Sequence, residues 1–125
     1  MSRILLVDDD SFVREALTRA LRTKGFDVEE AATLEAAEAY IETEPKLGAI
    51  VLDLWLGDRS GLELLQNRPG NSENVPIIAI SGGGPGRTLE QAVAMADALN
   101  ASAVLMKPFH NSELFGALQA VGLDV

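Results

Sequence analysis

Two hydrophobic patterns alternate along the chain. Short runs made up mostly of apolar residues alternate with longer segments in which apolar residues recur every three or four positions. The short runs are typical of parallel strands covered on both faces, and the longer segments are typical of amphipathic helices. The pattern predicts strands at about 3–7, 26–31, 49–53, 77–81 and 102–106. It predicts helices at about 11–24, 33–43, 61–68, 88–99 and 111–121.

The first predicted helix has clear boundary signals. Asp10 or Ser11 is suited to cap its N-terminus, and Gly25 is a conventional stop. We expect one apolar stripe of this helix to face the core, consisting of Phe12, Ala16, Leu17, Ala20 and Leu21. Two glutamates in the following strand, at 26–31, favour a position at the edge of the sheet.

Regular alternation of strand and helix predicts an α/β fold, with a parallel sheet covered by helices on both faces. The chain has 125 residues and no linker or repeat, so we expect a single domain over residues 1–125. Parallel strands share their carboxyl ends, and ligands of open α/β sheets bind at that edge. Polar groups follow four of the strands: Asp8 and Asp9, Asp53, Ser81 and Lys107. We therefore expect these side chains to converge.

Composition narrows the possible functions. There is no cysteine and only one histidine, which excludes thiolate catalysis, zinc-thiolate sites and histidine-rich metal sites. No apolar run reaches the roughly 18 residues that would span a bilayer, and the first residues do not form a signal peptide, so we expect a soluble, cytoplasmic protein with no membrane partner. A formal charge of −9 opposes general electrostatic binding to nucleic acid, which leaves proteins and cations as partners.

The converging residues favour phosphoryl chemistry with a metal. On its own, Asp53 could simply cap the helix that follows its strand. Three carboxylates brought together call for a hard divalent cation, for which Mg²⁺ or Mn²⁺ fits best. Lys107 offers a point charge and Ser81 a hydroxyl donor to a phosphate oxygen. A carboxylate can itself accept a phosphoryl group as an aspartyl-phosphate, and Asp53, alone on its strand, is the natural candidate.

At these positions the sequence resembles the receiver domain of two-component response regulators. The matching segments are ILLVDDD at 4–10, VLDL at 51–54, GLELL at 61–65, PIIAIS at 76–81 and KPF at 107–109. The resemblance covers nearly the whole chain. It implies a flavodoxin-like (βα)5 fold with strand order 2-1-3-4-5. It also implies a phosphoacceptor signalling domain and not an ordinary enzyme. At most, such a domain catalyses its own phosphotransfer and dephosphorylation.

Carried over by position, the resemblance implies a role for each site residue. Asp53 would accept a phosphoryl group from a phosphohistidine on a histidine kinase or phosphotransfer protein. Asp8, Asp9, Asp53 and the backbone carbonyl of Trp55 would hold Mg²⁺ or Mn²⁺. Ser81 would bond a phosphoryl oxygen, Lys107 would pair with the phosphoryl group or with Asp53, and the Lys107–Pro108 bond would be cis. Asp10 matches no site residue and is interpreted as a helix cap.

The sequence departs from the receiver pattern at the residues that relay the signal. Receivers usually carry Tyr or Phe three residues before the lysine, where this chain has Val104, and a glycine-rich loop follows Ser81. Our hypothesis is that phosphorylation acts through the loop at 82–87 and the helix after it. As in other receivers, we expect a downstream protein partner on the surface formed by the helix at 88–99, the strand edge at 102–106 and the last helix.

Two other functions are compatible with parts of the pattern. The segment at 81–88 superficially resembles a phosphate-binding P-loop, but Arg87 stands where the lysine belongs and Ser81 where the first glycine belongs. A receiver-like interaction domain that is never phosphorylated is the other alternative, favoured by Val104 and the altered loops. Because the sequence stops soon after the fifth predicted helix, we expect a stand-alone receiver, without an output domain, that acts by protein contact or phosphate shuttling.

Overall fold

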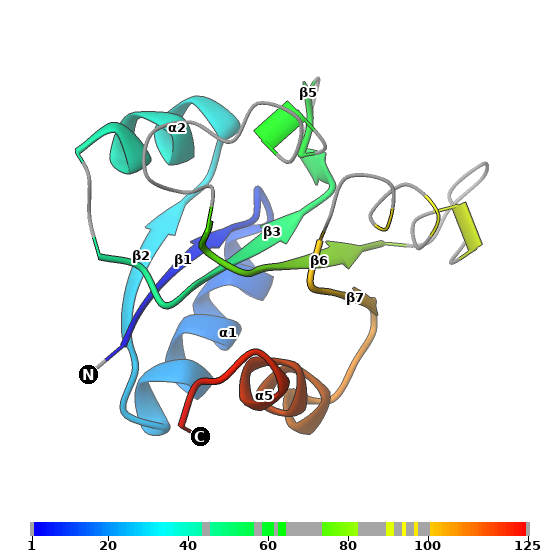
Figure 1. Cartoon of the computed structure of the whole chain (residues 1–125). Helices are drawn as coiled ribbons and strands as arrows, with labels where there is room; N and C mark the ends of the chain where they lie inside the picture. The colour runs from blue at the N-terminus through cyan, green and yellow to red at the C-terminus, as the bar shows by residue number, and fades with distance from the viewer. Residues whose placement is uncertain are drawn as a thin grey trace.

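In a computed structural model of the chain, the core is a five-stranded parallel sheet (Figure 1). The structure describes residues 2–43, 46–56, 59–61, 63–64, 74–82, 90–91, 94, 97 and 101–124. The sheet has the order β2-β1-β3-β6-β7. Its strands are β1 (Arg3–Val7), β2 (Asp27–Ala31), β3 (Ala49–Asp53), β6 (Ile77–Ser81) and β7 (Ala103–Met106). Taken in sequence, these five strands have the predicted order 2-1-3-4-5, so the predicted α/β fold is confirmed.

The burial of each strand follows its place in the sheet. Every residue of β3 and β6 is buried, as are all of β1 except Arg3. In β2 the burial is mixed, and only Val28 and Ala31 are buried. The central strands can be apolar throughout because helices cover both faces, whereas an edge strand tolerates charge. The edge position expected from the two glutamates is confirmed.

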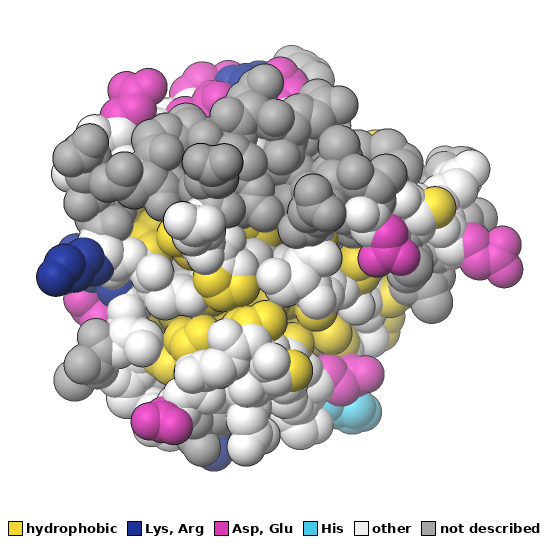
Figure 2. Space-filling view, in the orientation of Figure 1, with side chains coloured by type: hydrophobic (Ala, Val, Ile, Leu, Met, Phe, Trp, Pro, Cys, Tyr) yellow, Lys and Arg dark blue, Asp and Glu magenta, His cyan; other side chains and the backbone are white. Residues whose placement is uncertain are grey.

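Helices on the two faces of the sheet enclose two separate hydrophobic clusters (Figure 1). Helix α2 (Leu34–Glu42) packs on one face and buries Leu34, Ala37 and Ile41. Helices α1 (Ser11–Thr23) and α5 (Asn111–Ala120) lie on the other face. In the surface view, hydrophobic side chains show mainly in a band across the middle of the visible face (Figure 2). Of the helices that the structure describes, none is both long and apolar enough to cross a membrane.

The predicted buried face of α1 is confirmed at Leu17 and Leu21 and is wrong at Phe12 and Ala16. Phe12 is 83% exposed and Ala16 is also exposed, whereas the buried residues are Leu17, Thr18 and Leu21. The side chain of Asp10 accepts hydrogen bonds from the amides of Phe12 and Val13, and this cap fixes how the helix starts. The docking of the helix on the sheet turns Val13, Leu17 and Leu21 toward the core and leaves Phe12 and Ala16 facing outward.

The other boundary predictions are largely confirmed where the structure describes them. Thr33 caps α2 by accepting a hydrogen bond from the amide of Ala36, and Gly25 has the positive φ of +91° expected of a helix stop. The last helix starts at Asn111, as predicted. The predicted helices at 61–68 and 88–99 and the loop at 83–87 lie outside the described residues, apart from a few positions.

The chain after β3 forms a small hairpin that the sequence pattern did not predict. Strands β4 (Trp55–Leu56) and β5 (Arg59–Ser60) pair antiparallel, with Trp55 opposite Ser60. Gly61 then donates its amide to the carbonyl of Leu54. A Cβ atom at Gly61 would stand 2.2 Å from the carbonyl oxygen of Asp53, so only glycine fits this return of the chain. The hairpin thereby closes directly on the end of β3.

Candidate functional site

The carboxyl ends of four neighbouring strands bring the predicted site residues to one edge of the sheet. Asp8 and Asp9 follow β1, Asp53 ends β3, Ser81 ends β6 and Lys107 follows β7. Parallel pairing sets Asp53 opposite Ile80, next to Ser81, and the amide of Lys107 donates to the carbonyl of Ser81 at 2.8 Å. The expected convergence is therefore present in the structure.

Three carboxylates form the centre of this edge. Asp8, Asp9 and Asp53 each offer an oxygen atom, and these atoms all lie within 4.8 Å of one another. The Asp8 side chain is buried, Asp53 is only 4% exposed, and Asp9 is open to solvent. Oxygen ligands with one open side are the arrangement that Mg²⁺ and Mn²⁺ favour, because such ions keep several water molecules. The residues present therefore fit a hard divalent cation.

Lys107 is the cation that contacts this cluster. Its Nζ atom lies 2.8 Å from Oδ2 of Asp8 and 3.3 Å from Oδ2 of Asp53. Burial would lower the pKa of Lys107, but the hydrogen bond to Asp8 and the negative charges of Asp53 and Asp8 outweigh burial and raise it. The ammonium therefore stays charged. The peptide bond between Lys107 and Pro108 is cis, which confirms the expectation from the resemblance.

Asp53 is the carboxylate whose ionisation is most strongly perturbed. Its pKa is raised from 3.8 to about 6, mainly by burial and also by the nearby charge of Asp8. The amide of Trp55, which donates to Asp53 Oδ1 at 3.0 Å, and the charge of Lys107 act in the opposite sense. At neutral pH the group is mostly an anion held in a largely dry environment, which suits a nucleophile.

Arg14 supports the loop that carries the acidic pair. Its guanidinium donates to the backbone carbonyl of Asp8 at 2.8 Å and pairs with Glu30 at 3.1 Å. The side chain of Asp8 also accepts a hydrogen bond from the amide of Asp10. The interpretation of Asp10 as a helix cap is confirmed. Arg14 lies outside the predicted apolar stripe of its helix, and nothing in the sequence pattern indicated this supporting role.

Trp55 connects the end of β3 with the hydroxyl of Ser81. Its indole Nε1 donates to Ser81 Oγ at 3.2 Å, while its backbone amide bonds Asp53. The resemblance to receivers implied a role for the carbonyl of Trp55, as a metal ligand, and that role stays a prediction. The indole contact spans 26 residues of sequence, so no local pattern could have revealed it.

Charged residues join the hairpin to α2. Arg59 lies 2.8 Å from Glu35, 3.1 Å from Glu38 and 3.1 Å from Glu63. The hydrogen bond from Arg59 lowers the pKa of Glu35. A cavity of about 240 Å³ lies beside these residues and is lined in part by Asp9, Thr33 and Arg59. The acidic cluster is therefore open to solvent on the side of the hairpin.

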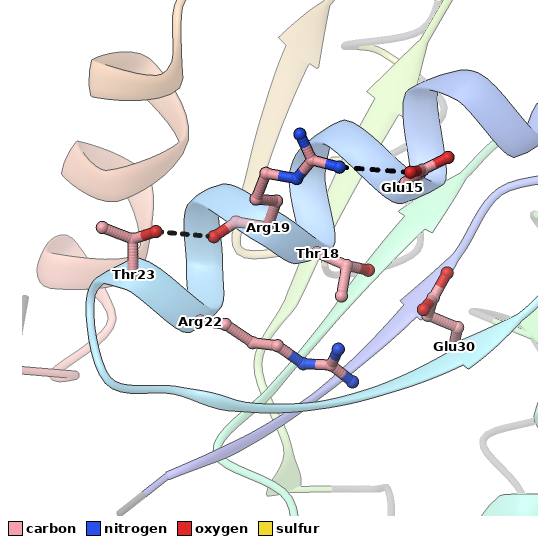
Figure 3. Close-up of a pocket in the computed structure, with 6 residues that line it drawn as sticks. All are labelled: Glu15, Thr18, Arg19, Arg22, Thr23 and Glu30. Carbon is pink, nitrogen blue, oxygen red and sulfur yellow. Dashed lines mark hydrogen bonds and ion pairs between the residues drawn. The ribbon is translucent and has the colours of Figure 1, made fainter.

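A larger cavity, of about 490 Å³, lies elsewhere, between α1 and β2 (Figure 3). Its charged side chains are largely engaged within the chain, because Arg19 pairs with Glu15 and Glu30 pairs with Arg14. The buried hydroxyl of Thr18 has no hydrogen-bond partner among the described residues. None of the predicted site residues lines this cavity, so its size does not make it the functional site.

Comparison with known proteins identifies the family. The family model described as "Response regulator receiver domain" matches residues 4–119. The chain belongs to the response regulator receiver domain family. The receiver of this family is a signalling domain of two-component systems.

Individual relatives agree with this assignment. Response regulator MprA of Mycobacterium tuberculosis is 35% identical over 120 residues, which are 95% of this chain and 50% of MprA. Acid tolerance regulatory protein ActR of Sinorhizobium medicae is 34% identical over 115 residues, covering 92% of this chain and 57% of ActR. The chain therefore spans about half the length of these relatives.

Solved structures confirm the receiver fold. The structure titled FixJ-N is 30% identical to this chain, with a TM-score of 0.83 and coverage of 100% of this chain and 98% of that one. Chemotaxis response regulator CheY4 of Vibrio cholerae is 26% identical with a TM-score of 0.83, covering 97% and 98% of the two chains. The backbone of the described residues is thus that of a receiver.

Proposed function

We propose that Asp53 accepts a phosphoryl group from a phosphohistidine on a histidine kinase or phosphotransfer protein, with Mg²⁺ or Mn²⁺ bound at Asp8, Asp9, Asp53 and the carbonyl of Trp55. The observation that carries this proposal is the cluster of three carboxylates around the buried Asp53, with Lys107 as its compensating cation. A helix cap would need neither the acidic pair nor the lysine. The proposed location of this exchange is the cytoplasm.

The proposed reaction exchanges one bond to phosphorus for another. An oxygen of Asp53 forms the new O–P bond as the P–N bond to the donor histidine breaks, and the electron pair of that bond stays with the imidazole. The raised pKa of Asp53 makes its carboxylate a better nucleophile than an exposed aspartate. A bound Mg²⁺ or Mn²⁺ would supply positive charge for the phosphoryl oxygens.

Lys107 and Ser81 take supporting roles in this proposal. The Lys107 ammonium already contacts Asp53, so it is placed to neutralise charge on the transferred group. The hydroxyl of Ser81, at the end of the neighbouring strand, would donate to a phosphoryl oxygen. The signal would then pass to a protein partner at α5, the edge of β7 and the helix predicted at 88–99, without a nucleic acid partner.

Mass measurement after incubation with a small phosphodonor tests this function. Wild-type protein incubated with Mg²⁺ and acetyl phosphate should gain the mass of one phosphoryl group, and Asp53→Asn should gain none. Asp27→Asn is the matched control, because Asp27 lies at the opposite end of the sheet, where it pairs with Arg3. No gain by the wild type, or equal gain by Asp53→Asn, would overturn the proposal and favour an interaction domain that is not phosphorylated.

A further inference from the structure

One aromatic residue contacts both the acceptor carboxylate and the hydroxyl predicted to bind the phosphoryl group. The backbone amide of Trp55 donates to Asp53 Oδ1 at 3.0 Å, and its indole Nε1 donates to Ser81 Oγ at 3.2 Å. Ser81 is fully buried, and among the described residues its hydroxyl has one other contact, a marginal hydrogen bond of 3.5 Å that it donates to the carbonyl of Gly82. The hydroxyl is therefore held mainly from the side of Trp55.

The chemistry of the two groups fixes the direction of this bond. An indole N–H can only donate, so the Ser81 oxygen must act as the acceptor. A serine hydroxyl has a single proton, and that proton must then point away from the indole. The proton is left available to an acceptor other than Trp55, and a hydroxyl that accepts one hydrogen bond also donates a stronger one. In the structure its acceptor is the carbonyl of Gly82, at a marginal 3.5 Å, and a phosphoryl oxygen on the adjacent Asp53 would be a better one.

Packing and strand pairing fix the position of the Trp55 indole. Trp55 is half-buried against the hydrophobic cluster on the α2 side of the sheet, and Val104 packs against the same cluster. The pairing of β4 with β5 fixes its backbone, with Trp55 opposite Ser60. The aromatic residue associated with the hydroxyl therefore comes from the hairpin after β3, while the β7 position holds a valine that has no polar group.

We infer that Trp55 is a positioning residue for phosphoryl transfer, which holds Ser81 Oγ so that its proton is directed to the phosphoryl group on Asp53. This inference rests on the proposed phosphoacceptor function and adds to it a residue that acts through Ser81. Trp55 itself does not touch the phosphorus. The indole bond also makes the environment of Trp55 depend on whether Ser81 has engaged a phosphoryl group.

A double-mutant cycle separates this role from a merely structural one. Trp55→Phe keeps an aromatic ring and removes the N–H donor, and we expect it to slow phosphoryl gain from acetyl phosphate about fivefold, the effect of losing one hydrogen bond. In a Ser81→Ala background the same change should have almost no further effect. Tyr40→Phe is the matched control, since Tyr40 belongs to the same cluster but its hydroxyl bonds Arg3, and its rate should equal that of the wild type.

The only tryptophan of the chain gives a second readout that needs no phosphorylation. Its single indole N–H resonance should exchange with solvent at least several-fold faster in Ser81→Ala than in wild type, because the acceptor is gone. Equal slowing by Trp55→Phe with and without Ser81, or unchanged indole exchange in Ser81→Ala, would overturn the inference while leaving Asp53 as the acceptor. A wild type that gains no phosphoryl group would overturn both this inference and the proposed function.

Discussion

Lys107 lies closer to Asp8 than to Asp53, with its Nζ atom 2.8 Å from the first carboxylate and 3.3 Å from the second. One ammonium therefore serves two buried carboxylates, and the exposed Asp9 adds a third negative charge. The described groups of the cluster sum to a negative charge, which a divalent cation would balance. Lys107 is therefore as much the partner of Asp8 as of Asp53.

Removing Lys107 should destabilise the fold in the absence of metal. We expect Lys107→Ala to lower the free energy of unfolding by about 2–3 kcal/mol, because the buried carboxylate of Asp8 loses its cation. Mg²⁺ should restore part of this loss by taking over the compensation. Urea denaturation at pH 7.5 with and without Mg²⁺ measures both effects. Lys46→Ala, at an exposed lysine away from the cluster, is the control and should change little; an equally small loss for Lys107→Ala would contradict the prediction.

Replacing Asp53 with a neutral side chain should stabilise the folded protein. Its pKa is raised in the folded protein from 3.8 to about 6, so folding binds a proton between these values and the stability of the wild type falls as pH rises through that window. We expect Asp53→Asn to be about 1–3 kcal/mol more stable than wild type at pH 7.5 without metal. The difference should vanish near pH 3.5, where both side chains are neutral. Denaturation curves at the two pH values check this, and a stabilisation independent of pH would count against it.

The affinity for Mg²⁺ should depend on pH around the pKa of Asp53. A cation needs an ionised carboxylate, and a proton on Asp53 competes with it. With a pKa of about 6 for Asp53, the affinity for Mg²⁺ should fall by about tenfold between pH 7.5 and pH 5. Titration calorimetry measures this change. In Asp53→Asn the binding should be weaker but should lose its dependence on pH near 6; the same dependence in that variant would assign it to another group.

Gly61 should tolerate no side chain. A Cβ atom there would stand 2.2 Å from the carbonyl oxygen of Asp53, so we expect Gly61→Ala to cost roughly 2 kcal/mol or more and to disturb the end of β3. Gly116 is the matched control, because it lies within α5 and a Cβ there meets nothing within 4 Å. Gly116→Ala should stabilise the protein by about 0.5–1 kcal/mol. Thermal denaturation of both variants distinguishes the outcomes, and equal stability of the two would refute the steric explanation.

The sheet and the convergence of the site could be predicted because their signals are local. Each strand is a short apolar run, its polar end follows directly, and parallel alternation fixes the edge to which Asp8, Asp53 and Lys107 belong. The cap at Asp10 was also readable, since a cap contacts the first turn of its own helix. The relay hypothesis for the loop at 82–87 stays a prediction.

The rest could not be predicted because it depends on contacts between distant segments. Phe12 is as apolar as the buried Leu17 and Leu21, and only the docking of α1 on the sheet leaves it exposed. Arg14 and the Trp55 indole act on partners 6 and 26 residues away, on other elements. A simple turn and a turn flanked by two short paired strands are both built from polar residues and glycine. The sequence therefore contained no sign of the pairing of β4 with β5.

The contacts of Arg59 with Glu35, Glu38 and Glu63 give the site a rim that responds to ionic strength. These side chains are partly exposed, with the side chain of Arg59 32% accessible, and dissolved salt weakens such contacts. The contact between Lys107 and Asp8 is shielded by the fold and is screened much less. High salt should therefore weaken the contacts of Arg59 with α2 before it affects the contact between Lys107 and Asp8. The position of the hairpin beside Asp53 can then be varied without altering the chemistry of Asp53.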